Sequence, residues 1–268
     1  PINWCPSCRI GLANEEVVEG KCERCGAEVE RRERKQWMLK ITEYADRLIE
    51  DLEGLDYLEK IKVQQINWIG KSCGTEIDFK IEGFKGLISV FTTRADTIFG
   101  ATALVLAPEH PIVASLTQTQ NSKFKIQNCD EVKNYIKQAK EKSEFERTQL
   151  IKEKTGIKLI GVMAINPVNS EKIPVWVGDY VVATYGGGAV MVVPAHDERD
   201  YDFAKKYGLK IREVVAGGDV SKRAFIDYGT LINSEQFNGL SSDEAIKKIT
   251  NYLEKSGTGR KRIQYKLR

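Results

Sequence analysis

The first pattern along the chain is a helical spacing of apolar side chains between residues 37 and 52. Steps of three and four residues put such side chains on one face of an α-helix. The spacing is carried by Trp37, Ile41, Tyr44, Leu48 and Leu52. The sequence therefore predicts an amphipathic helix that ends at Gly54. The short apolar stretch that follows at 64–72, QQINWIGKS, indicates a boundary.

Beyond residue 73 the pattern changes to alternation and short apolar runs. Ile77, Phe79 and Ile81 alternate with other residues, which is typical of a strand with one buried face. The segment 83–86, between two glycines, predicts a turn. Further strands are predicted by apolar runs at 87–91, 101–107, 173–185, 189–195 and 211–216.

Helices are interspersed with these strands. The highly charged segment 131–155 is predicted to be helical, and a short helix is predicted from Asp197 to Tyr207. Ser241 and Glu244 form a capping-box pattern before a helix that ends at Gly257. Because the strands and helices do not alternate regularly, we expect a mixed α/β domain, with a barrel-like sheet and helices on its outside.

Composition sets limits on the class of protein. The chain has 268 residues, of which 41% are hydrophobic, and its net charge is +3. This is enough for one large domain with a small appendage, or for two domains, and the charge gives only weak support for an anionic partner. No apolar run reaches the roughly 18 residues of a membrane span, and no signal-peptide pattern is present. Because the first residue is Pro1, we expect a fragment of a longer protein.

The cysteines near the N-terminal end of the sequence predict a small separate module. Two Cys-x-x-Cys knuckles, Cys5 with Cys8 and Cys22 with Cys25, are separated by a short segment. Two such knuckles are typical of a tetrahedral four-sulfur Zn²⁺ site in a small zinc ribbon. The alternatives are two disulfides or unused reduced thiols, but a Cys-x-x-Cys disulfide is strained. Since four cysteines leave no position for water, the zinc would be structural.

Two polar clusters carry the candidate chemistry. The first, in FTTRADTIFGATALVLAPEH, residues 91–110, gathers Thr92, Thr93, Thr97 and Thr102 around Arg94. A buried turn with these hydroxyls but no adjacent Cys, Lys or His offers hydrogen bonds and no strong nucleophile. We therefore expect any reaction to use a positioned water.

The second cluster follows the glycines of GGGAVMVVPAHDERD, where His196, Asp197, Arg199 and Asp200 crowd the start of a helix. One alternative is simple helix capping, because acids suit the positive end of the helix dipole. A phosphate cradle at the glycines is a further alternative, although the glycines precede a strand rather than a helix. His196 and Asp200, four residues apart, could also hold a metal.

Together the motifs NWCPSCRIGLANEEVVEGKCERCG, QQINWIGKS, FTTRADTIFG and GGGAVMVVPAHDERDYDFAKKYG resemble bacterial leucyl-tRNA synthetase. They match its zinc-binding module and its inserted connective-peptide editing domain, and the resemblance covers essentially the whole chain. It implies a zinc ribbon at 1–33, a helical connector at 34–72, an editing domain at 73–260 and a return linker at 261–268. The HIGH and KMSKS segments of the synthetic site are missing, so amino-acid activation is not expected.

The resemblance implies an editing hydrolase that cleaves the ester of tRNA-Leu misacylated with valine, isoleucine or norvaline and spares leucyl-tRNA-Leu. Thr97 would block the leucine side chain, and Asp200 would bind the substrate ammonium. The family positions imply catalytic roles for Thr92, Thr93, Arg94 and Asp200. They imply substrate-binding roles for Thr97, Tyr185, Asp197 and Arg199.

The implied partners are the misacylated 3′ end of tRNA-Leu and the remainder of the synthetase, in the cytoplasm and without a membrane. Two alternatives remain open. One is a non-catalytic tRNA-binding module, since zinc ribbons often bind nucleic acid and the tail at 259–268 is basic. The other is a metal-dependent hydrolase that uses His196 and Asp200.

Overall fold

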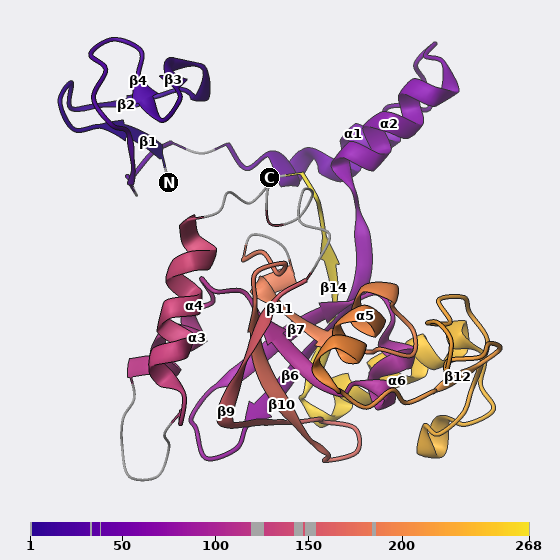
Figure 1. Cartoon of the computed structure of the whole chain (residues 1–268). Helices are drawn as coiled ribbons and strands as arrows, with labels where there is room; N and C mark the ends of the chain where they lie inside the picture. Colours follow the sequence, from indigo (N-terminus) through magenta and orange to yellow (C-terminus); the bar gives the residue numbers. More distant parts are fainter. Residues whose placement is uncertain are drawn as a thin grey trace. The chain divides into compact units, whose positions relative to one another are not determined.

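The computed structural model describes residues 2–32, 34–37, 39–118, 126–141, 147, 154–183 and 186–267. The chain divides into two compact units, Pro1–Tyr44 and Ala45–Arg268 (Figure 1).

The first unit is built from very short strands. Strands β1 (Ile2–Cys5), β2 (Ile10–Leu12) and β5 (Glu30–Arg32) form an antiparallel sheet in the order β2-β1-β5, and β3 (Val17–Val18) pairs with β4 (Lys21–Cys22). Its buried hydrophobic cluster consists of Cys5, Leu12 and Cys22. Because so small a core buries little apolar surface, a unit of this size needs a further staple, such as a metal.

The predicted helix over 37–52 is wrong in its first half. The 3₁₀ helix η2 covers Ile41–Tyr44 and α1 covers Ala45–Glu50, whereas Trp37 is fully exposed and precedes both. A short amphipathic segment is helical mainly where its apolar face packs against something, and Trp37, at the start of the predicted face, is fully exposed.

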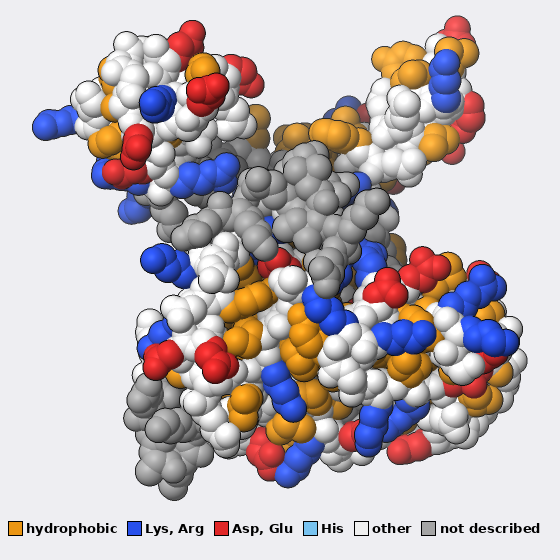
Figure 2. Space-filling view, in the orientation of Figure 1, with side chains coloured by type: hydrophobic (Ala, Val, Ile, Leu, Met, Phe, Trp, Pro, Cys, Tyr) orange, Lys and Arg blue, Asp and Glu red, His pale blue; other side chains and the backbone are white. Residues whose placement is uncertain are grey.

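Helix α2 (Glu59–Ile69) lies in the segment 34–72 that the resemblance implies to be a helical connector, although the residue pattern alone indicated only a boundary at 64–72. It ends at Gly70, whose φ of 59° is in the left-handed region that glycine adopts without strain. Leu58, Val63, Ile66 and Trp68 on this arm are exposed, and Figure 2 shows apolar atoms along it. The apolar residues of this helix therefore form no regular buried face from which the helix could have been predicted.

A mixed seven-stranded sheet forms the centre of the second unit (Figure 1). The order is β11-β8-β10-β9-β6-β14, with β7 also paired to β6, and only the β8–β10 pair is parallel. The strands are β6 (Ser72–Ile81), β7 (Leu87–Thr92), β8 (Ala103–Leu106), β9 (Gly156–Ile165), β10 (Lys172–Gly178), β11 (Ala189–Val192) and β14 (Gly259–Gln264).

This arrangement confirms the mixed α/β class but not the barrel-like sheet. β7 and β11 lie close to each other, yet no ladder of backbone hydrogen bonds joins them among the described strands. The sheet is therefore open. The four-residue strand β11 pairs along one edge only, with β8, which leaves no second ladder to close a ring.

Helices flank the sheet at α3 (Pro111–Gln118), α4 (Cys129–Glu141), α5 (Glu198–Tyr207) and α6 (Ser242–Ser256). The α5 and α6 predictions are confirmed, with Asp197 and Ser241 as N-caps and Gly208 and Gly257 as C-caps. Shorter elements are η1 (Asn14–Glu16), η3 (Ala95–Gly100), η5 (Gly186–Gly188), η6 (Glu235–Phe237), β12 (Val215–Ala216) and β13 (Thr230–Leu231).

Several boundaries differ from the sequence expectation. The strand predicted over 173–185 ends at Gly178, where a turn begins, and the one predicted over 211–216 is reduced to Val215–Ala216. β9 and α3 were missed. Helix α4 confirms part of the prediction over 131–155, of which 142–146 and 148–153 lie outside the described residues. None of the described helices combines the length and apolarity of a membrane span.

Candidate functional site

A pocket of about 420 Å³ in the second unit brings the two polar clusters together. The first cluster arrives at the end of β7 and in η3, and the second follows β11 and opens α5. Of the predicted site residues, the pocket is lined by Thr92, Thr93, Arg94, Thr97, Asp197, Arg199 and Asp200. Tyr185 lies outside the described residues.

The threonine turn is held by its own backbone. The Thr92 hydroxyl oxygen accepts a hydrogen bond from the Arg94 N–H at 3.0 Å, and the Thr97 hydroxyl donates to the Arg94 carbonyl at 2.9 Å. Thr97 is only 2% exposed. Because its hydroxyl is tied to the main chain and its surroundings are packed, Thr97 presents a fixed shape to the pocket.

Arg94 is engaged mainly with its neighbours in the fold. Its Nε and Nη2 donate to the carboxylate of Asp96, which is completely buried, at 3.0 and 2.9 Å. Its Nη1 donates to the carbonyl of Ile226 at 2.9 Å, and its guanidinium lies 4.7 Å from the ring centroid of Tyr228. This bidentate pairing of the Arg94 guanidinium with the Asp96 carboxylate is directional, so it fixes the geometry of the turn.

Asp200 is the buried carboxylate of the pocket. It lies in the first turn of α5, and its Oδ2 accepts a hydrogen bond from the Val193 N–H at 2.8 Å. Burial, reinforced by the negative charge of Asp197, raises the pKa of Asp200 to about 7, although the Val193 N–H and Arg199 oppose this. A cation placed beside Asp200 would favour its ionised form, so the residue is suited to bind one.

Asp197 confirms the capping interpretation of the acidic cluster. Its carboxylate accepts hydrogen bonds from the N–H groups of Arg199 and Asp200, at 2.8 and 3.1 Å. This is the usual N-cap arrangement, which satisfies orphan donors of the first turn. Both of these bonds reach the same oxygen, Oδ1, while the residue lines the pocket.

His196 is a buried structural residue of this region. Its Nε2 lies 3.0 Å from the Val214 N–H and 3.1 Å from the Val215 N–H, so this nitrogen must be an acceptor. Its Nδ1 then donates to the carbonyl of Phe225 at 2.9 Å. Burial lowers the pKa of His196, in keeping with a neutral ring. With both nitrogens occupied, His196 is not available as a metal ligand or a base.

The glycines at 186–188 serve a turn rather than a cradle. All three have positive φ, of 64°, 76° and 75°, as they lead into β11. A Cβ on Gly188 would approach the Cα of Ala183 to 3.1 Å. None of the three lines the pocket among its described residues.

The apolar wall of the pocket was not predicted. It consists of Phe91, Tyr180, Val181, Val182, Val190, Met191 and Val193. These residues lie in or beside strands, and a strand sequence does not state which of its two faces meets a cavity. The runs themselves were recognised, but their role in the pocket depends on tertiary packing.

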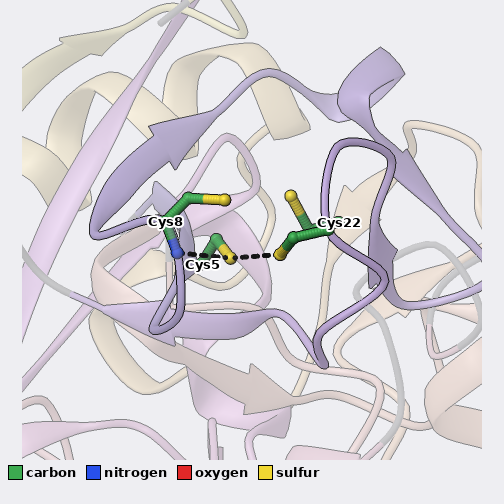
Figure 3. A group of neighbouring side chains, drawn as sticks. Cys5, Cys8 and Cys22 are labelled. Atoms are coloured by element: carbon green, nitrogen blue, oxygen red, sulfur yellow. Dashed lines mark hydrogen bonds between the residues drawn. The ribbon is translucent and has the colours of Figure 1, made fainter.

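The four predicted metal ligands lie together in the first unit. The sulfur atoms of Cys5, Cys8, Cys22 and Cys25 are all within 4.8 Å of one another, and all four cysteines are free. Figure 3 shows Cys5, Cys8 and Cys22 directed toward one another from two turns. Sulfurs bound at about 2.3 Å to one tetrahedral metal would be about 3.8 Å apart, so only a small contraction is needed.

Residues 66–254 match the sequence model of the family described as "Leucyl-tRNA synthetase, editing domain". The chain belongs to this family. The match includes every pocket residue named above, so the pocket lies within the editing domain.

Relatives and solved structures agree with this membership. The chain is 54% identical over 269 aligned residues to the leucine–tRNA ligase of Alkaliphilus oremlandii (strain OhILAs), covering all of this chain and 33% of the relative. It is similar in structure to LeuRS in the ternary complex of Agrobacterium radiobacter K84 agnB2 LeuRS, tRNA and LeuAMS. There the TM-score is 0.72 and the identity 35%, over all of this chain and 30% of that one. The chain thus spans about a third of the length of these proteins.

Proposed function

We infer that this chain hydrolyses the ester bond of tRNA-Leu misacylated with valine, isoleucine or norvaline, and that it spares leucyl-tRNA-Leu. The observation that carries this proposal is the single pocket that holds both Thr97 and Asp200. Family membership indicates the class of reaction. Within the pocket, Thr97 would select the substrate side chain by shape, and the carboxylate of Asp200 lines the same pocket.

The reaction needs no protein nucleophile. The oxygen of a bound water attacks the ester carbonyl carbon, and the bond from this carbon to the ribose oxygen breaks. The ribose oxygen takes up one proton of the water and leaves as a free hydroxyl, while the amino acid leaves as a carboxylate and the second proton of the water passes to solvent. The protein contributes by holding water and ester in a reactive geometry.

Asp200 is proposed to bind the α-ammonium of the substrate. Its Oδ2 already accepts one N–H from Val193, which fixes the carboxylate and leaves lone pairs for the ligand. Pairing with the ammonium favours ionisation of Asp200 and offsets the cost of burying its charge. This interaction places the ester carbonyl at a constant distance from the α5 terminus.

The hydroxyls are proposed to hold water and ribose. The Thr92 oxygen accepts from Arg94, so its own hydrogen can be donated to the ligand, and Thr93 lines the same pocket. Arg94 keeps this turn in place through Asp96. Asp197, Arg199 and Tyr185 are proposed as further substrate contacts, on family position.

There is a thermodynamic reason why a synthetase needs a separate editing site after its synthetic site. One methylene changes binding in an apolar pocket by only about 1–3 kcal/mol, a range known from other aminoacyl-tRNA synthetases. A synthetic site therefore admits smaller or straight-chain competitors of leucine. Thr97, fixed by its bond to the Arg94 carbonyl, is proposed to exclude the correct side chain by shape.

The test is the substitution Asp200→Ala. We expect it to lower deacylation of valyl-tRNA-Leu at least about 100-fold, because a buried charge-assisted contact is lost. Asp202→Ala is the matched control, since Asp202 lies exposed on the same helix. Unchanged turnover by the folded Asp200→Ala protein would remove the basis of the assignment.

We further propose that the four-cysteine cluster binds one structural Zn²⁺. Four thiolate ligands fit Zn²⁺ and leave no open position. When bound, the ion would supply the staple that the small core of the first unit lacks. The editing site would not involve it, because the pocket residues belong to the second unit.

The remaining partners are proposals as well. The tRNA and the rest of a leucyl-tRNA synthetase are proposed from the relatives, of which this chain spans a third. A non-catalytic tRNA-binding module is the second candidate, favoured by the zinc-ribbon pattern of the cysteines and by the basic tail at 259–268. In the structure this tail forms β14, where Arg260 and Arg262 both pair with the buried Glu76. Two of its cations are thereby paired with a carboxylate of the fold, although both side chains remain about half exposed.

A further inference from the structure

Tyr228 is an aromatic side chain at the edge of the editing pocket, 54% exposed and two residues from Ile226, which is 52% exposed. Exposed apolar side chains are common and carry no meaning singly. The position of Tyr228 differs because two pocket residues hold its segment in place.

Arg94 and His196 make these attachments. The Arg94 guanidinium covers the Tyr228 ring at 4.7 Å and also donates to the Ile226 carbonyl. His196 donates to the Phe225 carbonyl, and the Phe225 N–H donates to the Ala195 carbonyl at 2.8 Å. The segment 225–228 is thus fixed to the turn and strand end that form the pocket, so the ring is oriented before any ligand arrives.

The size of the pocket leaves part of the substrate outside. Its volume of about 420 Å³ is in the lower part of the range of about 300–1,000 Å³ for sites of drug-sized ligands. One aminoacylated nucleoside is a ligand of that size. The nucleotide that precedes it in a tRNA chain must therefore lie outside the pocket, and Arg94, which lines the pocket, contacts the segment 225–228 directly.

The charges beside Tyr228 favour a base over a phosphate. Ile226 and Asp227 line a separate hollow of about 520 Å³, whose charged residues also include Glu198, Asp219, Lys222 and Arg223. Lys222 in that hollow is already paired with Asp219 at 3.0 Å. With three carboxylates and two cations around the hollow, a phosphate gains little attraction there, whereas an aromatic ring binds any nucleobase by stacking.

We propose that the Tyr228 ring stacks on the nucleobase next to the aminoacylated terminal nucleoside. The proposal rests on the proposed editing function and adds a second contact to it. Tyr228 would act on affinity rather than on the chemical step, because its ring is not part of the pocket that holds the ester.

The experiment compares two substrates of different length. One is valyl-adenosine, and the other is the trinucleotide CCA with valine on its 3′ end, both as esters and as non-hydrolysable amides. For Tyr228→Ala we expect about 5- to 100-fold weaker binding and a raised KM for the trinucleotide, from the loss of one base–aromatic stack. Values for the single nucleoside should remain those of the wild type.

Three controls make the result specific. Tyr228→Phe and Tyr228→Trp keep an aromatic face and should bind the trinucleotide as the wild type does. Tyr252→Ala removes a tyrosine that is 39% exposed on α6, and should have no effect on binding. Thermal unfolding checks that each variant is folded.

The outcomes separate this proposal from the editing function. An equal loss for both substrates would show that Tyr228 acts through Arg94 on the pocket and would overturn stacking, as would no loss for either. If the wild type hydrolyses neither ester, the editing function itself fails, and the amides then report whether the rim still binds the longer ligand.

Discussion

Thr97 is the residue on which substrate discrimination depends in the proposed mechanism. It is buried, and its hydroxyl is fixed to the backbone by one hydrogen bond. A side chain held in this way cannot move aside for a larger substrate without breaking that bond. In the proposed mechanism this fixed shape supplies the selectivity against leucine.

Thr97→Ala should make leucyl-tRNA-Leu a substrate. Removing the hydroxyl and methyl groups gives room for about one more substrate methylene, so kcat/KM for the leucyl ester should rise at least about 10-fold. Deacylation of leucyl- and valyl-tRNA-Leu by purified protein measures this. Thr102→Ala is the control, because Thr102 is buried near the same turn but does not line the pocket. Continued sparing of the leucyl ester would mean that another group excludes it.

Asp200 gives a prediction about stability and pH. Its folded pKa of about 7 is above the ordinary 3.8, so the folded state binds the proton more tightly than the unfolded state does. The stability contributed by this group is complete below pH 3.8 and is lost as pH rises through about 7. Asp200→Asn, which cannot ionise, should be as stable as the wild type near pH 4 and more stable at pH 8, by on the order of a few kcal/mol.

Chemical unfolding at several pH values measures this difference. The exposed Asp202→Asn change on the same helix should show no such trend. A stability difference for Asp200→Asn that is constant from pH 4 to pH 8 would contradict the raised pKa.

At the level of elements, neighbouring residues at the start of α5 cap the helix, line the pocket and bind neighbouring segments. Asp197 caps the helix, Asp200 faces the pocket, and His196 ties the strand end to the segments at 214–215 and 225. The capping interpretation and the site interpretation of this cluster were alternatives on sequence. The structure shows Asp197 as the N-cap and places both Asp197 and Asp200 in the pocket lining, so capping and the proposed site role do not exclude each other.

The two cysteine knuckles predict a metal-dependent first unit. Bound Zn²⁺ contributes about 10–16 kcal/mol of apparent binding energy in small structural sites, which is more than so small a core supplies. Cys22→Ser should therefore reduce zinc content below one per chain and abolish ordered structure in the first unit, as followed by NMR. Cys73→Ser, which changes an exposed cysteine outside the cluster, should retain one zinc. A folded first unit with no bound metal would argue against the site.

At the level of the whole molecule, the sheet creates the pocket. The two polar clusters are about a hundred residues apart in sequence, at the ends of β7 and β11. These strands come close although each pairs with a different neighbour, β6 or β8. Thr97 lies in η3, just after β7, and Asp200 lies in α5, just after β11. Because β7 and β11 lie close together, these two residues line one pocket.

The sequence allowed many local features to be predicted, since these depend on neighbours along the chain. Capping of α5 and α6, the alternation in β6 and the cysteine spacing are of this kind, and the structure confirms the first two and the proximity of the sulfurs. The apolar spacing at 37–52 was misleading, because a periodic pattern does not state whether a packing partner exists.

The sequence by itself determined the polar residue types available to the site, the turns and helix ends that carry them, and the four cysteines proposed to bind a metal. Only the tertiary structure decided that His196 has both nitrogens occupied, that Arg94 is committed to Asp96, and which apolar side chains wall the pocket. The reason is physical. Hydrogen-bond saturation, burial and cavity shape arise between segments distant in sequence, and these contacts exist only once the strands have paired.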